Sequence, residues 1–207
     1  MAVIELKKSV NELRNVTEVF GLPKAGKTTL TKRIGRRKYV LNWKEIGRKK
    51  KIYLFLKYLI LHPLNLAYLF YKLNSNKIKM EHLGIKEYYL IWRMRNSYLS
   101  ATLAKYEYLK EFSEKIIADE FALQSIFMIL QKKSDEKEIM EIMGHLPSSG
   151  RILIVESKDK ERYRRLSKIK KFTRELDKRY KMKWWKTIEH NYKIIKEILK
   201  ERYKVAT

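Results

Sequence analysis

The 207-residue sequence predicts a helix-rich α/β fold in which a short parallel sheet is flanked by helices. Short β-branched runs alternate with longer segments at helical spacing. This alternation is typical of βαβ units with helices on both faces of the sheet, which makes three layers. The sequence contains neither an internal repeat nor a linker rich in Gly, Ser or Pro, so we expect one domain spanning residues 1–207.

Four short strands are expected, and the helices between them are longer. Residues 151–156 (RILIVE) have the clearest strand pattern, because turn residues precede an apolar run. Residues 15–20 and 39–41 have the β-branched and aromatic character of strands, and residues 115–119 form an apolar run that ends on a carboxylate. Residues 2–13 are expected to form a short helix or an irregular lead-in. The expected helices are residues 28–37, 50–73 in two pieces, 84–112, 121–132, 135–143, 159–180 and 185–203.

The composition can support a hydrophobic core and excludes several kinds of site. Hydrophobic residues make up 45% of the chain and aromatic residues 12%. Cysteine does not occur, which excludes disulfides and cysteine-ligated zinc or iron–sulfur sites. Residues 1–15 carry acidic side chains and no continuous apolar centre, so we expect no secretion signal and a cytoplasmic protein. The apolar stretch 52–73 contains Lys57, Pro63 and Lys72, which argue against a membrane-spanning helix.

The net charge of +25 is concentrated in two blocks of the chain. Residues 21–57 contain 13 Lys or Arg and one acid, and residues 158–207 contain 19 Lys or Arg and 7 acids. Concentrated blocks favour a polyanionic partner, either a nucleic acid (RNA or DNA) or an anionic membrane surface contacted peripherally. A lysine-rich solvated surface is the simpler alternative.

Residues 21–29 read GLPKAGKTT and match the phosphate-binding pattern G-x-x-x-x-G-K-[ST]. A predicted strand enters this loop and a predicted helix leaves it, which is the setting that a P-loop requires. Gly21 and Gly26 let the backbone turn and approach phosphate oxygens without a Cβ in the way. The pattern therefore predicts binding of the β- and γ-phosphates of a nucleoside triphosphate, with magnesium.

The residues of this loop have separate expected tasks. Lys27 is expected to reach the β- and γ-phosphates as a point charge, and the Thr28 hydroxyl is expected to ligate Mg²⁺. The N-terminus of the following helix adds a favourable potential for anions. The backbone N–H groups expected to contact the phosphates belong to Lys24, Ala25, Gly26, Lys27, Thr28 and Thr29.

The magnesium ion needs a second protein ligand, for which a carboxylate at the end of a buried strand is suited. Asp119 ends the apolar run of residues 115–119 and is the best candidate in the chain. The adjacent Glu120 is a candidate to order the metal's water shell or to accept a proton from an acceptor hydroxyl. The alternative is that Asp119 only caps the helix that follows.

The order of these elements resembles the nucleoside and nucleotide kinase group of P-loop proteins, which includes thymidylate and deoxynucleoside kinases. The shared order is a P-loop, a mid-chain strand ending in Asp119 and Glu120, and an apolar strand followed by an arginine-rich helix. The resemblance implies ATP-dependent phosphoryl transfer, with the basic segment 158–180 as a lid over the transferring group. It implies that Arg162 and Arg165, with Arg164 as a further candidate, stabilise charge in the transition state.

Three departures separate the chain from the familiar members of that group. Glu120 stands where the group usually has an arginine, and Asn42 and Trp43 stand where an acid follows the second strand. The lid arginines lack the usual spacing, because Leu166 falls four residues after Arg162. A divergent kinase that acts on another hydroxyl or phosphate is therefore the preferred interpretation.

The acceptor is expected among the helices of residues 50–112. Arg93 and Arg95 are two residues apart and do not share a helix face. One of them is therefore a candidate to bind an acceptor phosphate or carboxylate. The aromatic residues of the same segment are expected in the core rather than stacked on a base or sugar. These residues are Tyr88, Tyr89, Trp92 and Tyr98.

The leading functional hypothesis is an ATP-dependent kinase with an unassigned small-molecule acceptor. The alternative is a nucleic-acid-binding NTPase or a polynucleotide kinase, since contacts from Lys and Arg to phosphates dominate affinity for nucleic acids. Trp184 and Trp185 are candidates either for stacking on bases or for packing a helix onto the core. A third hypothesis is a peripheral membrane kinase, supported by the basic residues 48–51 beside the apolar stretch 52–73.

Overall fold

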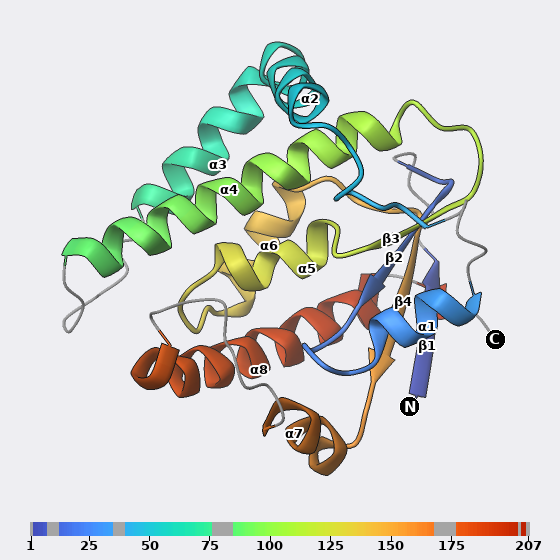
Figure 1. Ribbon diagram of the computed structural model, residues 1–207, viewed down its shortest axis with the longest axis vertical. Coiled ribbons are helices and arrows are strands. Elements are labelled where there is room, and N and C mark those ends of the chain that lie inside the picture. The colour runs from blue at the N-terminus through green and yellow to red at the C-terminus, as the bar shows by residue number, and fades with distance from the viewer. Residues whose placement is uncertain are drawn as a thin grey trace.

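In the described residues, five strands form one mixed sheet in the order β3-β2-β4-β1-β5 (Figure 1). The structure is a computed structural model that describes residues 2–7, 13–34, 40–75, 85–167, 177–202 and 204–205. The strands are β1 (Ala2–Lys7), β2 (Val16–Phe20), β3 (Ile116–Asp119), β4 (Arg151–Glu156) and β5 (Lys204–Val205). β2 pairs in parallel with both β3 and β4. This three-stranded parallel unit confirms the predicted parallel sheet.

The N-terminal segment contains a strand, so the helix or irregular lead-in expected for residues 2–13 is wrong for residues 2–7. β1 pairs antiparallel with β4 over its whole length, from Ala2 opposite Glu156 to Lys7 opposite Arg151. β5 extends the sheet by pairing antiparallel with β1. The partner of β1 lies far away in the sequence, and strand formation depends strongly on such neighbours. A local pattern of six residues could not reveal this pairing.

Eight helices occur in the described parts of the chain, close to the expected positions. They are α1 (Lys27–Ile34), α2 (Arg48–Leu61), α3 (Pro63–Ser75), α4 (Ile85–Leu109), α5 (Ala122–Ile129), α6 (Glu136–His145), α7 (Asp159–Ser167) and α8 (Asp177–Arg202). The expected break at Pro63 separates α2 from α3, whereas α8 begins earlier than the predicted residue 185. Of the helix expected over residues 159–180, residues 168–176 lie outside the described residues. The expected strand at residues 39–41 is reduced to a single parallel bridge between Val40 and Ile117, and residue 39 lies outside the described residues.

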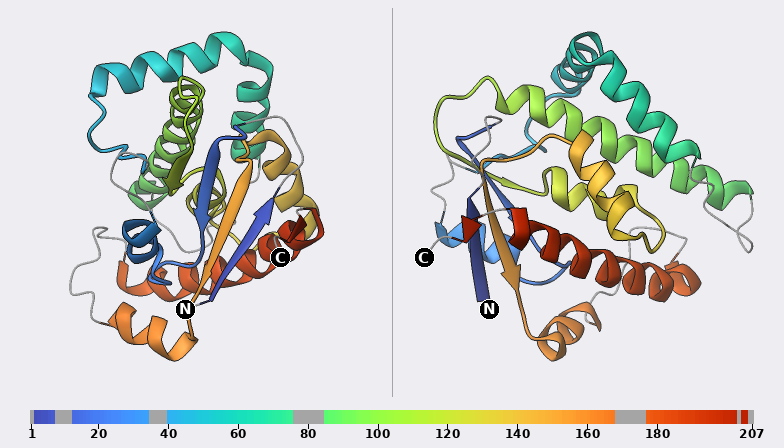
Figure 2. Two further views of the ribbon diagram at one scale, coloured as in Figure 1. Left: turned by 90° about the vertical axis from the view of Figure 1, so that its right-hand side faces the viewer. Right: turned by 180° about the vertical axis from the view of Figure 1, so that it is seen from behind.

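Helices cover both faces of the sheet, and strand side chains alternate between the two faces (Figure 2). On one face, Val19 of β2 and Val155 of β4 form a small cluster with Leu30 of α1. On the other face, Val16 and Phe20 of β2 belong to a larger core to which α3, α4, α5, α6 and α8 contribute. The helix-rich α/β class predicted from the sequence is therefore confirmed.

The carboxyl ends of the three parallel strands meet at one edge of the sheet. Val19 lies opposite Asp119 of β3, and Phe20 lies opposite Ile154 of β4. The segments that leave these strands therefore start side by side, which is where open α/β sheets bind ligands. These segments begin at residues 21, 120 and 157.

Among the described residues, no single helix has the length and apolar character needed to cross a membrane. α2 and α3 meet these criteria only when taken together, and they are bent by 101° where they join.

Replacing Phe20 with alanine should lower the free energy of unfolding by about 3–5 kcal/mol, because a fully buried ring would leave a cavity. The ring of Phe20 lies 5.4 Å, centroid to centroid, from both Phe127 of α5 and Tyr192 of α8. Chemical denaturation measures the change. The matched control is Leu64→Ala, which removes a side chain that is 85% exposed and should change stability by less than about 0.5 kcal/mol. Equal effects of the two substitutions would contradict the packing described here.

Candidate active site

The loop after β2 together with the first two residues of α1, residues 21–28, is called the glycine loop, and its backbone requires glycine at two positions. A Cβ on Gly21 would lie 2.4 Å from the carbonyl oxygen of Val155, which is a steric clash with the neighbouring strand. Gly26 has a φ of 104°, a conformation that other residues rarely adopt. Helix α1 begins at Lys27, so the strand–loop–helix order predicted from the sequence is confirmed.

The side chain of Lys27 folds back across the glycine loop. Its Nζ donates hydrogen bonds to the carbonyl oxygens of Gly21 at 3.0 Å and Leu22 at 3.2 Å, and the residue is buried. Burial lowers the pKa of Lys27, while the carboxylates of Asp119 and Glu120 act to raise it. The carbonyl oxygens of Gly21 and Leu22 thus hold the cationic Nζ of Lys27 at the loop. A negatively charged oxygen of a ligand can replace them as the hydrogen-bond acceptor.

Asp119 lies where β3 ends, beside the start of α1. Burial raises the pKa of the Asp119 carboxyl, whereas Lys27 and a hydrogen bond with the side chain of Thr28 lower it. Its Oδ1 is buried and has no hydrogen-bond partner among the described residues. The structure therefore brings together Lys27, Thr28 and Asp119, three of the residues selected from the sequence.

A hydroxyl and a carboxylate at one position fit a magnesium ion, which takes one or two protein oxygens and completes its shell with water and phosphate. The free Oδ1 of Asp119 supplies an oxygen that is otherwise unsatisfied. In the described parts of the chain, no three His, Cys, Asp or Glu side chains gather into a site made of protein ligands alone.

Lys105 of α4 is a site residue that the sequence analysis missed. Its Nζ donates to the carbonyl oxygen of Glu120 at 2.6 Å and lies 5.9 Å from the ring centroid of Trp43. Burial lowers the pKa of Lys105, and Glu120 is the strongest of the carboxylates that act to raise it. Glu120 is exposed and has a φ of 60°. Its signal in the sequence is a single basic residue within an apolar segment of the helix.

Glu18 of β2 is a second residue that the sequence analysis missed. Its side chain is fully buried, and its Oε1 accepts hydrogen bonds from the backbone N–H groups of Leu123 at 2.8 Å and Gln124 at 3.2 Å. Burial raises the pKa of Glu18 to about 8, although these two donors act to lower it. Glu18 thus ties the first turn of α5 to β2 and fixes the segment that carries Asp119 and Glu120.

The arginines of α7 occupy two different environments. Arg165 donates from Nη1 to the carbonyl oxygen of Lys24 at 3.2 Å, so α7 contacts the glycine loop directly. Arg162 is 2% exposed, and its Nη2 pairs with Glu189 of α8 at 2.6 Å and with Asp159 at 3.1 Å. The structure therefore places Arg165 at the loop, whereas Arg162 forms one ion pair with Glu189 of α8 and one with Asp159 of its own helix.

A cavity of about 690 Å³ opens beside the glycine loop. It is lined by Leu22 and Ala25 of the loop, by residues 157–159 after β4, and by Arg162. Tyr192 of α8 also lines it and donates its hydroxyl to Glu156 at 3.2 Å. Its volume is within the range of small-molecule sites in proteins.

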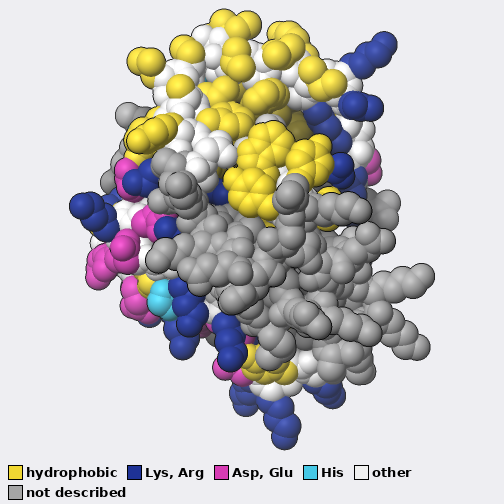
Figure 3. All heavy atoms as spheres, turned by 90° about the vertical axis from the view of Figure 1, so that its left-hand side faces the viewer, with side chains coloured by type: hydrophobic (Ala, Val, Ile, Leu, Met, Phe, Trp, Pro, Cys, Tyr) yellow, Lys and Arg dark blue, Asp and Glu magenta, His cyan; other side chains and the backbone are white. Residues whose placement is uncertain are grey.

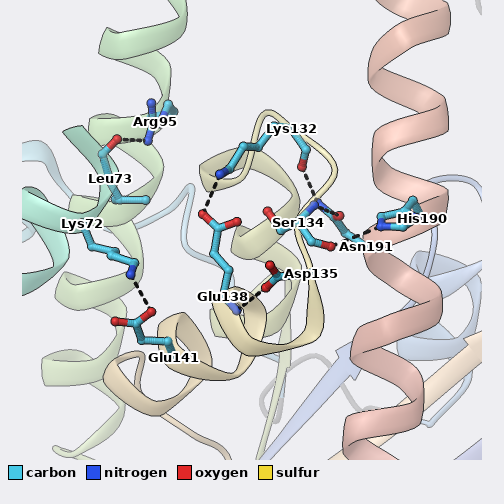
Figure 4. Close-up of polar contacts among 10 residues, drawn as sticks. All are labelled: Lys72, Leu73, Arg95, Lys132, Ser134, Asp135, Glu138, Glu141, His190 and Asn191. Atoms are coloured by element: carbon cyan, nitrogen blue, oxygen red, sulfur yellow. Dashed lines mark hydrogen bonds and ion pairs between the residues drawn. The ribbon is translucent and has the colours of Figure 1, made fainter. Parts of the chain in front are cut away.

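Arg93 and Arg95, the predicted acceptor-binding residues, lie farther along α4. Arg95 is buried and binds the carbonyl oxygen of Leu73, which joins α4 to α3 (Figure 4). Arg93 is exposed. Ten residues of helix separate Arg95 from Lys105, a distance of about 15 Å along the axis. The structure thus does not bring these arginines together with Lys27 and Asp119.

Two expectations about aromatic residues have opposite outcomes. Trp185 is 7% exposed, and Trp184 is partly buried and packs on the core, so helix packing accounts for this pair. The aromatic residues of α4 that we expected in the core are instead exposed, by 37% to 54%. These are Tyr88, Tyr89, Trp92 and Tyr98.

Comparison with models of known protein families, with curated proteins and with solved structures finds no match to this chain. Its function is therefore inferred from the chemistry of its own residues.

The free energy of unfolding should fall as the pH rises from about 5 to about 8, because Glu18 stays protonated in the folded protein up to about pH 8 but ionises near 4.5 when unfolded. Between these pH values the folded state binds more protons than the unfolded state. The contribution of Glu18 to the free energy of unfolding is therefore fully present below pH 4.5 and is lost as the pH rises through 8. Glu18→Gln cannot ionise, so its stability relative to wild type should increase with pH. Denaturation at several pH values tests this, with the more exposed Glu111→Gln as control. Parallel profiles for wild type and Glu18→Gln would contradict the assignment.

Proposed function

We propose that the protein is a P-loop phosphotransferase of the kinase type, which binds ATP with magnesium and transfers its γ-phosphoryl group. The observation that supports this most strongly is the convergence of Lys27, Thr28 and Asp119 at one edge of the sheet. The first turn of α1 supplies a cation and a hydroxyl there, and the end of β3 supplies a carboxylate. This set is the one that P-loop enzymes use to hold phosphates and Mg²⁺.

In this proposal the nucleotide displaces the internal contacts of the glycine loop. Lys27 exchanges the carbonyl oxygens of Gly21 and Leu22 for the β- and γ-phosphate oxygens. Thr28 and Asp119 would hold the magnesium ion, which would neutralise negative charge on the phosphate oxygens. The adjoining cavity, bounded by Leu22 and Ala25, takes the base and ribose.

The transfer itself breaks the bond between the γ-phosphorus and the oxygen that bridges it to the β-phosphate, and forms a bond to an acceptor oxygen. Arg165 is the arginine that reaches the transferring group, because it already contacts the backbone of Lys24. Glu120 is exposed beside Asp119 and accepts the proton of the acceptor hydroxyl. Lys105, which donates to the carbonyl oxygen of Glu120, and Trp43, whose ring lies near Lys105, form the wall against which the acceptor binds.

Replacing Lys27 with alanine should weaken binding of ATP with magnesium by about tenfold to 100-fold, since hydrogen bonds to charged phosphate oxygens are lost. Calorimetric titration measures binding. Transfer of labelled γ-phosphate is measured with separate pools of nucleosides, nucleoside monophosphates, sugars, and RNA or DNA with 5′-hydroxyl ends. The matched control is Lys32→Ala, an exposed lysine in the last turn of α1. Nucleotide binding that is unchanged in Lys27→Ala would refute the proposed phosphate site.

Replacing Arg165 with alanine should lower the rate of phosphoryl transfer by at least about 100-fold, because an arginine that neutralises transition-state charge is lost. Nucleotide affinity should change little, so kcat and the dissociation constant of ATP separate the two effects. Arg164→Ala, which removes an exposed arginine of the same helix, is the control. If both variants transfer phosphate as fast as wild type, α7 has no role in the reaction.

A further inference from the structure

Helices α2 and α3 expose an apolar surface at one end of the molecule (Figure 3). We call this surface the α2–α3 patch and define it by six side chains that are between 49% and 85% exposed. They are Ile52, Tyr53, Leu56, Ile60, Leu64 and Tyr71. Isolated exposed apolar residues are common, but a group of this size on adjoining helices indicates an interaction surface.

The outward face of α2 is as apolar as its inward face. Leu54 and Tyr58 are buried in the protein, and Ile52, Leu56 and Ile60 follow each other at four-residue spacing on the opposite side. A helix on the surface of a protein in water normally carries polar residues on that side. α2 is therefore built to contact something apolar on both of its sides.

The most exposed apolar side chains lie where the two helices join. Ile60 is 73% exposed near the end of α2, and Leu64 is 85% exposed at the start of α3. The bend of 101° between the helices makes this junction a projecting corner of the molecule (Figure 2). Tyr71 lies two helical turns beyond Leu64 on the same side of α3.

Basic residues accompany the patch, and acidic residues are missing from this part of the sequence. No Asp or Glu occurs between Glu45 and Glu81, whereas α2 begins with four consecutive basic residues. Arg48 and Lys49, the first two of these, are exposed. An apolar face beside Lys and Arg matches the headgroups and upper acyl chains of an anionic bilayer. A second copy of this chain, with its net charge of +25, would bring like charges together.

We propose that the α2–α3 patch docks the protein peripherally onto an anionic lipid bilayer. Ile60 and Leu64 enter the interface between headgroups and acyl chains, and Arg48 and Lys49 contact the anionic headgroups. The surface is separate from the glycine loop, and the proposal stands whether or not the protein is a kinase.

The test is flotation of the full chain with vesicles of phosphatidylcholine alone and of phosphatidylcholine mixed equally with phosphatidylserine. Wild type should bind the mixed vesicles and not the neutral ones. The double variant Ile60→Ser, Leu64→Ser keeps every charge and should bind the mixed vesicles at least about tenfold more weakly, because two exposed apolar side chains no longer enter the bilayer. Ile34→Ser, which changes a 51% exposed residue of α1, is the matched control and should bind as wild type does.

Three outcomes would overturn the proposal. The first is equal binding of wild type and the double variant to the mixed vesicles, which would mean that electrostatic attraction alone holds the protein on the bilayer. The second is absence of wild-type binding to mixed vesicles. The third is a self-association seen by light scattering that the double variant abolishes without any vesicle binding, which would identify a second copy as the occupant. Circular dichroism confirms that the variants fold.

Discussion

Val19 lies opposite Asp119 where β2 pairs in parallel with β3, so the loop that leaves β2 and the carboxylate that ends β3 face the same edge of the sheet. A shift of one residue in this register would turn the Asp119 side chain to the other face. The larger core holds the register, because Val16 and Phe20 of β2 and Ile116 and Ala118 of β3 pack into it. The position of the candidate site is thus a consequence of how the sheet packs on α5 and α8.

Several ionisable side chains are buried near this edge of the sheet, although the burial of a charge is energetically unfavourable. Burial shifts the pKa of Lys27 and Lys105 downward and that of Glu18 and Asp119 upward. Backbone groups compensate, since both lysines donate to carbonyl oxygens and Glu18 accepts from two N–H groups. Shifted pKa values that cluster in one place are typical of functional sites. The Oδ1 of Asp119 and the Oε2 of Glu18 lack a partner among the described residues, so this compensation is incomplete at both carboxyl groups.

The sequence predicted the parts of the molecule whose signal is local. The glycine loop, the strand before it and the carboxylate at the end of β3 follow from short patterns with strict chemical requirements. β1 could not be predicted, because its partner β4 is distant in sequence. Glu18 and Lys105 were missed for the same reason, since their partners are backbone groups of segments that only the fold brings near. Apolar and aromatic residues at helical spacing are expected in the core. The aromatic residues of α4 and the apolar outward face of α2 are exposed instead, and only the structure reveals such exceptions.

The central claim is that residues 21–28 hold the phosphates of a nucleoside triphosphate with magnesium between Thr28 and Asp119. A crystal structure with magnesium and a non-hydrolysable ATP analogue tests it most directly. We expect the phosphates to lie in the glycine loop, with Lys27 Nζ moved from the carbonyl oxygens of Gly21 and Leu22 to the β- and γ-phosphates. A nucleotide bound elsewhere, with Lys27 still on those carbonyl oxygens, would contradict the account.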